Sequence, residues 1–500
     1  MKSLLFLLFL TLLSISIASS DATKPKSRYA WVSFLYGTSY FTTLRVMQAS
    51  VRRSGTPHDI VTLVDEDVGP SYRKRLQEDG VIVLDIPKRI ENSYAGDAVF
   101  QSRFGAVMSK LNMFNMTQYE KIIYMDADTM MIDQFHKNND VLFECGDFCA
   151  VFINPCIFNS GVMVIKPNSD LFADMISKID KLESYDGADQ GFLNSYFNDL
   201  LSAPMFDPSK VGTEKLKGSF RLPTTFHVDH FLFYQRAKWD MPCLRPRILE
   251  FMGPAFLKPW NWWTYVILDL SWEWLSLKNN LPGGDPEWIY FTGYLAFTAA
   301  VYMIFRIIFK SKTSGALSRK LQSKRPSESL QTMQCLIVGF SILVLCLYSV
   351  FRLINPSTHP TYAIIIFLIW SHCLAPILYV QFCRLNFEPT TTHGGPSRAA
   401  IGVRRRTFIF ALLPSVCLLF FSTLWSMLNM MFLFTKVAFL VVAILAQIGS
   451  FFVFFGWTAA LWMQTYHYSA KETSVLTTTN TWISNGAISG CMEHSKNLKG

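Results

Sequence analysis

Long apolar stretches in the C-terminal half limit what this chain can fold into more than any other feature. Five runs are each long enough to cross a bilayer as a helix: Ile289–Phe309, Met333–Ile354, Tyr362–Phe382, Phe408–Met430 and Val437–Met463. They account for much of an apolar content of 50% with 42 Phe, which is high for a soluble enzyme of 500 residues. We therefore predict a five-span transmembrane region over residues 289–463 and a cytosolic tail over 464–500.

The N-terminus has the pattern of a secretory signal peptide. Lys2 precedes an apolar core, Leu4–Ile17, and the small residues Ala18, Ser19 and Ser20 follow. This pattern predicts a cleavable signal over residues 1–20, with an uncleaved anchor as the alternative. Either one would place the next segment in the secretory lumen.

Basic residues gather in two of the loops between the predicted spans. If the first large segment is lumenal, the loops after the first and third spans should be cytosolic and rich in Lys and Arg. Those two loops carry Lys310, Lys312, Arg319, Lys320, Lys324 and Arg325, and Arg384, Arg398, Arg404, Arg405 and Arg406. The opposite loops hold little beyond Arg352 and Lys436. The formal charge of +9 thus indicates topology and not nucleic-acid binding.

Between residues 28 and 262, short β-type runs alternate with helical ones. We expect strands at Tyr29–Tyr36, Asp59–Val64, Val81–Asp85 and Ile122–Met125, and helices at Tyr40–Arg53, Ser71–Asp79 and Arg103–Asn115. Such alternation predicts an α/β domain with a mostly parallel, Rossmann-like sheet. Ligands of these sheets bind outside the carboxyl ends of the strands.

Two aspartates, Asp126 and Asp128, follow the last of these strands. Alternation along an extended chain points both side chains the same way. Together they could hold a hard divalent cation and leave coordination sites open for the phosphates of a nucleotide. Aspartates at strand ends are also ordinary turn formers, so the pair needs further residues in support.

Further polar segments lie downstream. Asn159-Ser160-Gly161 should form a turn before a strand, where its polar groups could bind sugar hydroxyls or simply shape the turn. Asp186–Gln190 should open a helix at Phe192–Phe197, either as caps or as sugar contacts. Lys258, after Gly253, could meet a diphosphate. Cys145 and Cys149 are expected to form a disulfide or remain as buried thiols.

Taken in order, these segments resemble the motif series of glycosyltransferase family 8, the glycogenin-like family of retaining enzymes with the GT-A fold. The series comprises Lys110, Asp126-Ala127-Asp128, Asn159-Ser160-Gly161, Asp186-Gly187-Ala188-Asp189-Gln190 and Lys258-Pro259-Trp260. The likeness covers roughly residues 28–262. With the C-terminal spans added, the chain is most similar to the plant glycogenin-like glucuronosyltransferases.

The resemblance implies a lumenal GT-A, Rossmann-like nucleotide-sugar domain followed by an α-helical transmembrane bundle. It also implies that Asp126 and Asp128 bind Mn²⁺, that Asp189 lies near the reacting carbon, and that Lys258 contacts the diphosphate. Lys110 and Gln190 join Asp189 as expected catalytic residues. The other implied donor-binding residues are Ala127, Asn159, Ser160, Gly161, Asp186, Gly187, Ala188 and Gly253.

One position departs from the family pattern. A histidine usually precedes the Gly-x-x-Lys-Pro-Trp element and completes the metal site, whereas this chain has Glu250, with extra spacing before Lys258. Glu250 could serve as a third carboxylate ligand, which should tighten metal binding and loosen nucleotide binding. Alternatively, His227 or His230 could replace the missing histidine, or the site could be impaired.

The predicted function is Mn²⁺-dependent, retaining transfer of a sugar, glucuronate by resemblance, from a UDP-sugar to a lipid or polysaccharide acceptor. Arg103 and Lys110 are candidate partners for the uronate carboxylate. The expected location is a Golgi or endoplasmic reticulum membrane. Residues 263–288, rich in Trp, form an expected membrane-proximal linker. The alternative is a non-enzymatic multi-span protein, a transporter, scaffold or sugar sensor, whose lumenal domain has lost turnover.

Overall fold

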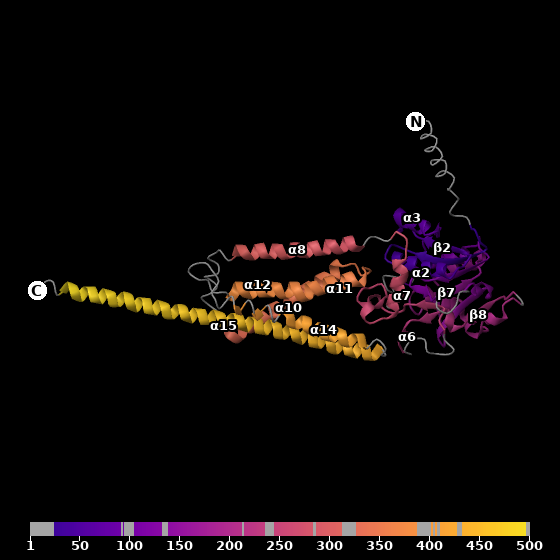
Figure 1. The fold of residues 1–500 in the computed structure, drawn as a ribbon. Coiled ribbons are helices and arrows are strands. Elements are labelled where there is room, and N and C mark those ends of the chain that lie inside the picture. Colours follow the sequence, from indigo (N-terminus) through magenta and orange to yellow (C-terminus); the bar gives the residue numbers. More distant parts are fainter. Residues whose placement is uncertain are drawn as a thin grey trace, which may run out of the picture. The chain divides into compact units, whose positions relative to one another are not determined.

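A computed structural model of the chain divides into two compact units, Met1–Trp260 with Thr264–Gly284, and Asn261–Trp263 with Asp285–Gly500 (Figure 1). The structure describes residues 25–91, 94, 105–132, 139–212, 215–235, 245–283, 287–312, 327–387, 402–403, 406–407, 411–427 and 433–496. The predicted signal peptide lies outside these residues, so it stays a prediction.

A seven-stranded mixed sheet forms the centre of the first unit. Its strands are β1 (Tyr29–Leu35), β2 (Asp59–Val64), β3 (Ile82–Asp85), β4 (Lys121–Met125), β6 (Phe148–Asn154), β7 (Ile157–Ile165) and β8 (Ser219–Leu222), in the order β3-β2-β1-β4-β7-β6-β8. The pairs among β3, β2, β1 and β4 are parallel, as predicted. Strand β7 then runs antiparallel to both β4 and β6.

Both faces of this sheet are apolar and covered. Successive residues of β1 alternate between two buried clusters: Ala30, Val32 and Phe34 belong to one, and Trp31 and Leu35 to the other. Near-continuous hydrophobic strands are typical of a sheet buried on both sides. The covering elements include helices α2 (Phe41–Arg53), α3 (Pro70–Glu78), α4 (Ser169–Lys178) and α5 (Asp189–Tyr196), and the 3₁₀ helix Val107–Asn115.

Two local predictions need correction. Asn159-Ser160-Gly161 lies inside β7 and not in a turn. The turn comes earlier, because Asn154 Oδ1 accepts hydrogen bonds from the backbone N–H groups of Cys156 and Ile157. The helix expected at Arg103–Asn115 is a 3₁₀ helix over Val107–Asn115, and Arg103 lies outside the described residues.

A second, three-stranded sheet brings distant segments together. Its strands are β5 (Thr129–Met131), β10 (Ile248–Glu250) and β9 (Val228–Asp229), in the order β5-β10-β9. Strand β10 pairs antiparallel with β5, which places Glu250 opposite Thr129. The residue directly after Asp128 therefore fixes the position of Glu250.

The segment expected to be a linker contains a helix of the first unit, α7 (Leu270–Asn279). Trp274 on this helix is buried, with its ring centroid 6.2 Å from that of Trp260, whereas Trp272 is half exposed. Part of the aromatic sequence thus serves core packing within the first unit.

The second unit is helical and strongly apolar. Its main helices are α8 (Glu287–Lys312), α10 (Glu328–Leu353), α11 (Pro360–Leu368), α12 (Ala375–Phe387), α14 (Leu412–Met427) and α15 (Leu433–Lys496). Among the described residues, four segments are long and apolar enough to span a bilayer: Glu287–Ile308, Ser329–Leu353, Pro360–Arg384 and Lys436–His467. These four helices indicate a membrane protein.

The remaining predicted span, Phe408–Met430, extends beyond the described residues at both ends. Its described part includes a shorter apolar helix, Leu412–Phe421, so the fifth span stays a prediction. The predicted tail begins inside α15, which continues as one helix to Lys496.

Candidate active site

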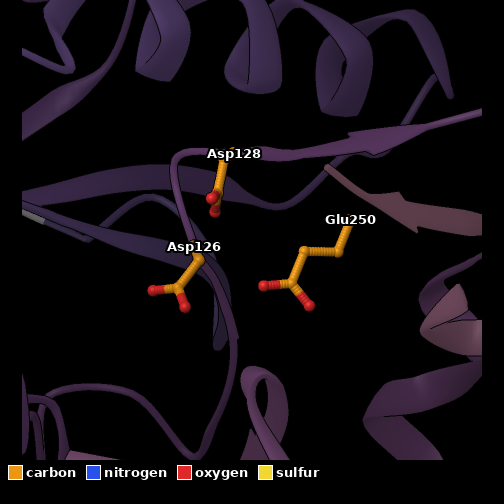
Figure 2. Close-up of side chains that lie close together, drawn as sticks. All are labelled: Asp126, Asp128 and Glu250. Atoms are coloured by element: carbon orange, nitrogen blue, oxygen red, sulfur yellow. The ribbon is translucent and has the colours of Figure 1, made fainter. Parts of the chain in front are cut away.

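Three carboxylates converge at the end of β4. Asp126 and Asp128 follow that strand directly, and Glu250 ends β10. One oxygen from each lies within 4.8 Å of the other two, and Figure 2 shows the three side chains close together. Among the described residues, this group can hold a metal ion. Its all-oxygen donor set suits a hard divalent cation.

The structure brings Glu250, and neither of the two histidine rings, into the group of carboxylates. His227 Nε2 lies 2.7 Å from Glu250 Oε2, so it contacts the third carboxylate and is not a member of the group. The buried His230 ring packs against Phe231 and Phe251, while its backbone N–H donates to the Glu250 carbonyl. Glu250 therefore lies beside the aspartates, the His227 ring contacts its carboxylate, and the His230 ring does not.

Two buried lysines, Lys110 and Lys258, balance the negative charge of the two aspartates. Lys258 Nζ lies 2.7 Å from Asp128 Oδ2 and donates to the Phe251 carbonyl at 2.6 Å. Burial by itself would lower the pKa of Lys258, but Asp128 outweighs it and raises that pKa. Lys258 is thus a charged group at the place where a diphosphate would need one.

Lys110 lies between Asp126, at the end of β4, and Asp189, at the start of α5. Its Nζ lies 3.2 Å from Asp126 Oδ1, 2.8 Å from Asp189 Oδ2 and 3.3 Å from Ser160 Oγ. Burial would lower the pKa of Lys110, but the Asp126 and Asp189 carboxylates raise it overall. The three hydrogens of the ammonium group therefore have three protein partners.

Asp189 and Gln190 open α5 and face β7. Ser160 Oγ donates to Asp189 Oδ2 at 2.8 Å, and the Ser160 backbone N–H donates to Gln190 Oε1 at 3.2 Å. Gln190 Nε2 in turn donates to the Tyr185 hydroxyl at 2.5 Å. The start of the helix is thus fixed against the strand.

Asp186 and Asn159 have structural duties that the sequence left open. Asp186 Oδ1 accepts from Ser184 Oγ and from the backbone N–H groups of Ala188 and Gly191, so it shapes the turn before α5. Gly187 in that turn has φ +64°, which favours glycine. Asn159 donates to Glu250 through Nδ2, and its Oδ1 accepts from the Gly161 N–H.

These residues surround one cleft with a volume of about 420 Å³. It is lined by Phe34, Leu35, Tyr36, Tyr40, Val107, Lys110, Tyr124, Asp126, Ala127, Asp128, Asn159, Ser160, Asp186, Ala188, Asp189, Gln190, Glu250, Met252, Gly253 and Lys258. The expected catalytic, donor-binding and metal residues, including Glu250, all line it except Gly161 and Gly187. The alternative ligands His227 and His230 do not line it, and Arg103 lies outside the described residues. A cleft of this volume lies in the range of pockets that bind small molecules, which have apolar walls and a few placed polar groups.

Tyr124 is a further residue of the site, which no predicted motif contains. Its hydroxyl donates to Asp126 Oδ1 at 2.6 Å. Tyr124 stands two residues before Asp126 in an extended segment, so the two side chains share a face, and this spacing could have revealed it. Burial raises the pKa of Asp126 to about 6, with Lys110 opposing that effect and the Asp128 and Asp189 charges adding to it. A divalent cation would relieve this crowding of negative charge.

Gly161 permits the close approach of β7 to the carboxylates. A Cβ at this position would lie 3.0 Å from Asn159 Oδ1, 3.1 Å from His227 Cε1 and 3.2 Å from Asp126 Oδ2. We expect Gly161→Ala to weaken the binding of a divalent cation such as Mn²⁺ by about tenfold, since a misplaced ligand costs on the order of 1–2 kcal/mol. Titration of the variant with Mn²⁺ checks this. Gly293→Ala is the control, because a Cβ added to this helical glycine would have open space around it. Unchanged Mn²⁺ affinity would contradict the expected crowding.

Several known proteins are similar to this chain in sequence. No profile of a known protein family matches the chain. "Putative glucuronosyltransferase PGSIP7" of Arabidopsis thaliana is 32% identical over 363 residues, which cover 71% of each chain. "Inositol phosphorylceramide glucuronosyltransferase 1" of the same plant is 37% identical over 57% of this chain and 52% of its own. Glycogenin-1 of Caenorhabditis elegans is 30% identical over 46% of this chain and 51% of its own.

Among solved structures, galactosyltransferase LgtC in complex with donor and acceptor sugar analogues aligns over 52% of this chain and 98% of its own. The identity is 16% and the TM-score 0.34, which is too low to support a conclusion. The family of this chain is therefore inferred from its sequence relatives. The degree and extent of the likeness to PGSIP7 place this chain in the glycogenin-like family of glycosyltransferases, beside the plant proteins named as glucuronosyltransferases.

Proposed function

We propose that this glycosyltransferase is metal-dependent and retaining, and that it transfers glucuronate from UDP-glucuronate to a membrane-associated lipid or polysaccharide acceptor. One observation carries the proposal: three carboxylate oxygens within 4.8 Å of one another share a cleft with two buried lysines. The names of the plant relatives support glucuronate as the sugar.

The donor's diphosphate would bind between the carboxylates and Lys258. A divalent ion held by Asp126, Asp128 and Glu250, Mn²⁺ by family resemblance, would supply Lewis-acid stabilisation of the departing UDP. Lys258 would add a second positive charge, because its ammonium group already lies 2.7 Å from Asp128 and can contact a phosphate oxygen nearby. Lysine serves well here as a point charge for phosphate.

The sugar would lie against the start of α5. The Asp189 carboxylate, held by Lys110 and Ser160, would stabilise positive charge at the reacting carbon. In a retaining transfer, the acceptor hydroxyl attacks from the face that the diphosphate leaves. Gln190 would fix the sugar near its reacting carbon, while Lys110 would hold Asp189 in position.

The donor sugar can be identified by comparing the catalytic efficiency of the protein with different UDP-sugars. A uronate carboxylate paired with a cation gains about 1.5–3 kcal/mol, or roughly 10–100-fold in kcat/KM over the neutral sugar. We therefore expect purified full-length protein to release UDP from UDP-glucuronate at least tenfold more efficiently than from UDP-glucose or UDP-galactose. Mass spectrometry of the products with Mn²⁺, and with EDTA as the control, measures this.

Two other results would count against the proposal. Equal kcat/KM for the three donors would contradict a preference for glucuronate, but it would still be consistent with glycosyltransferase activity. UDP binding without turnover of any donor would favour the non-enzymatic alternative.

We further propose that the catalytic unit faces the lumen of a Golgi or endoplasmic reticulum membrane. The basic loops after the first and third predicted spans support this orientation. The disulfide between Cys145 and Cys149 supports it independently, because disulfides persist in oxidising compartments. A membrane-bound catalytic unit suits an acceptor that is itself held at the membrane.

A further inference from the structure

Two buried side chains hold the same oxygen of Glu250. Asn159 Nδ2 donates to Glu250 Oε2 at 2.8 Å, and His227 Nε2 lies 2.7 Å from that atom. The exposed fractions are 4% for Asn159, 2% for His227 and 9% for Glu250. Two donors on Oε2 leave Oε1 as the oxygen available to a cation, and Figure 2 shows the carboxylate turned toward the aspartates.

The contact with Glu250 also fixes how His227 can act. A hydrogen bond to a carboxylate oxygen requires a proton on Nε2, and a protonated ring nitrogen has no lone pair for a metal. The other nitrogen, Nδ1, is buried without a hydrogen-bond partner among the described residues. His227 therefore cannot ligate through Nε2 while it holds Glu250.

The ring also has little room to turn. A Cβ on Gly161 would lie 3.1 Å from His227 Cε1, which shows how closely the imidazole packs against the backbone of β7. Strand β7 also carries Asn159. The same strand therefore packs against the His227 ring and supplies the second hydrogen-bond donor to Glu250.

We infer that His227 is a positioning residue that orients Glu250 as the third ligand, so that the metal site is all-oxygen and discriminates less between Mn²⁺ and Mg²⁺ than a site with an imidazole ligand would. The inference rests on the proposed function, since it concerns the same site. Imidazole ligands favour later transition metals, whereas carboxylate ligands suit Mg²⁺, Ca²⁺ and Mn²⁺. In this chain the imidazole acts one hydrogen bond away from the cation.

The first test measures Mn²⁺ affinity by electron paramagnetic resonance on full-length protein in detergent, in the presence of UDP. We expect His227→Ala to weaken Mn²⁺ binding by about 10–100-fold, the usual loss when a partner of a metal ligand is removed. His227→Gln should recover most of the affinity, because an amide N–H can donate to Glu250 Oε2. His230→Gln is the matched control, since the His230 ring does not touch the Glu250 carboxylate, and it should bind Mn²⁺ like the wild type.

The second test measures competition by Mg²⁺ against Mn²⁺ in the same assay. Glu250→His gives the site a nitrogen ligand and should raise the preference for Mn²⁺ over Mg²⁺ by at least about tenfold. Unchanged Mn²⁺ affinity in His227→Ala, or an unchanged preference in a folded Glu250→His protein, would overturn the inference alone. Failure of the wild type to bind Mn²⁺ in the presence of UDP would overturn the proposed metal-dependent function instead.

Discussion

Asp126→Asn should reduce glycosyl transfer by about 10³-fold while leaving the protein folded. The substitution preserves the size of the side chain but removes one of the three carboxylates whose oxygens lie within 4.8 Å of one another. Loss of a group that stabilises developing charge typically costs about 10²–10³-fold in kcat, and loss of the cation would add to that. Steady-state release of UDP at saturating Mn²⁺ measures the change.

A surface aspartate provides the matched control. Asp174 bonds to Lys178 at 2.7 Å on the exposed side of α4, and its side chain is 45% exposed. Asp174→Asn makes the same chemical change away from the cleft and should leave turnover within about twofold of the wild type. If Asp126→Asn kept wild-type activity, the carboxylate group would not be the metal site of this enzyme.

Local sequence patterns were sufficient for the first half of the catalytic unit. The apolar run that becomes β4 could be identified because its residues are buried on both faces, and the two aspartates follow directly at its end. The parallel pairing of β1, β2, β3 and β4 follows from the helices between the strands. These are short-range signals.

The rest of the site depends on contacts between distant residues, which a local pattern does not contain. Glu250 reaches Asp128 only because β10 pairs with β5 in one register. His227 and Asn159 meet Glu250 from two other strand regions, and neither contact has a signature in the sequence. The residue types of Asn159-Ser160-Gly161 favour a turn, but the pairing of β7 with β4 and β6 overrides that preference.

Lys110→Met should destabilise the catalytic unit by about 3–5 kcal/mol, the usual result of removing one member of a buried ion pair. The Lys110 side chain is 3% exposed and lies between Asp126 and Asp189, so its loss leaves two carboxylates without their shared counter-ion. For a unit of this size, that corresponds to a decrease of roughly 10 °C in the thermal midpoint. Tryptophan fluorescence of the full-length protein in detergent follows the transition.

Adding a metal ion, and comparing a control variant, separates the loss of the Lys110 charge from a packing defect. Mn²⁺ with UDP should recover part of the lost stability in Lys110→Met, since a cation at Asp126 replaces half of the missing compensation while Asp189 stays unpaired. Lys166→Met removes a lysine that is 56% exposed and 3.1 Å from Asp147, and it should cost less than about 1 kcal/mol. Equal destabilisation by the two variants, or no recovery with Mn²⁺, would mean that Lys110 stabilises the fold by packing, and that the charge balance of the site does not depend on it.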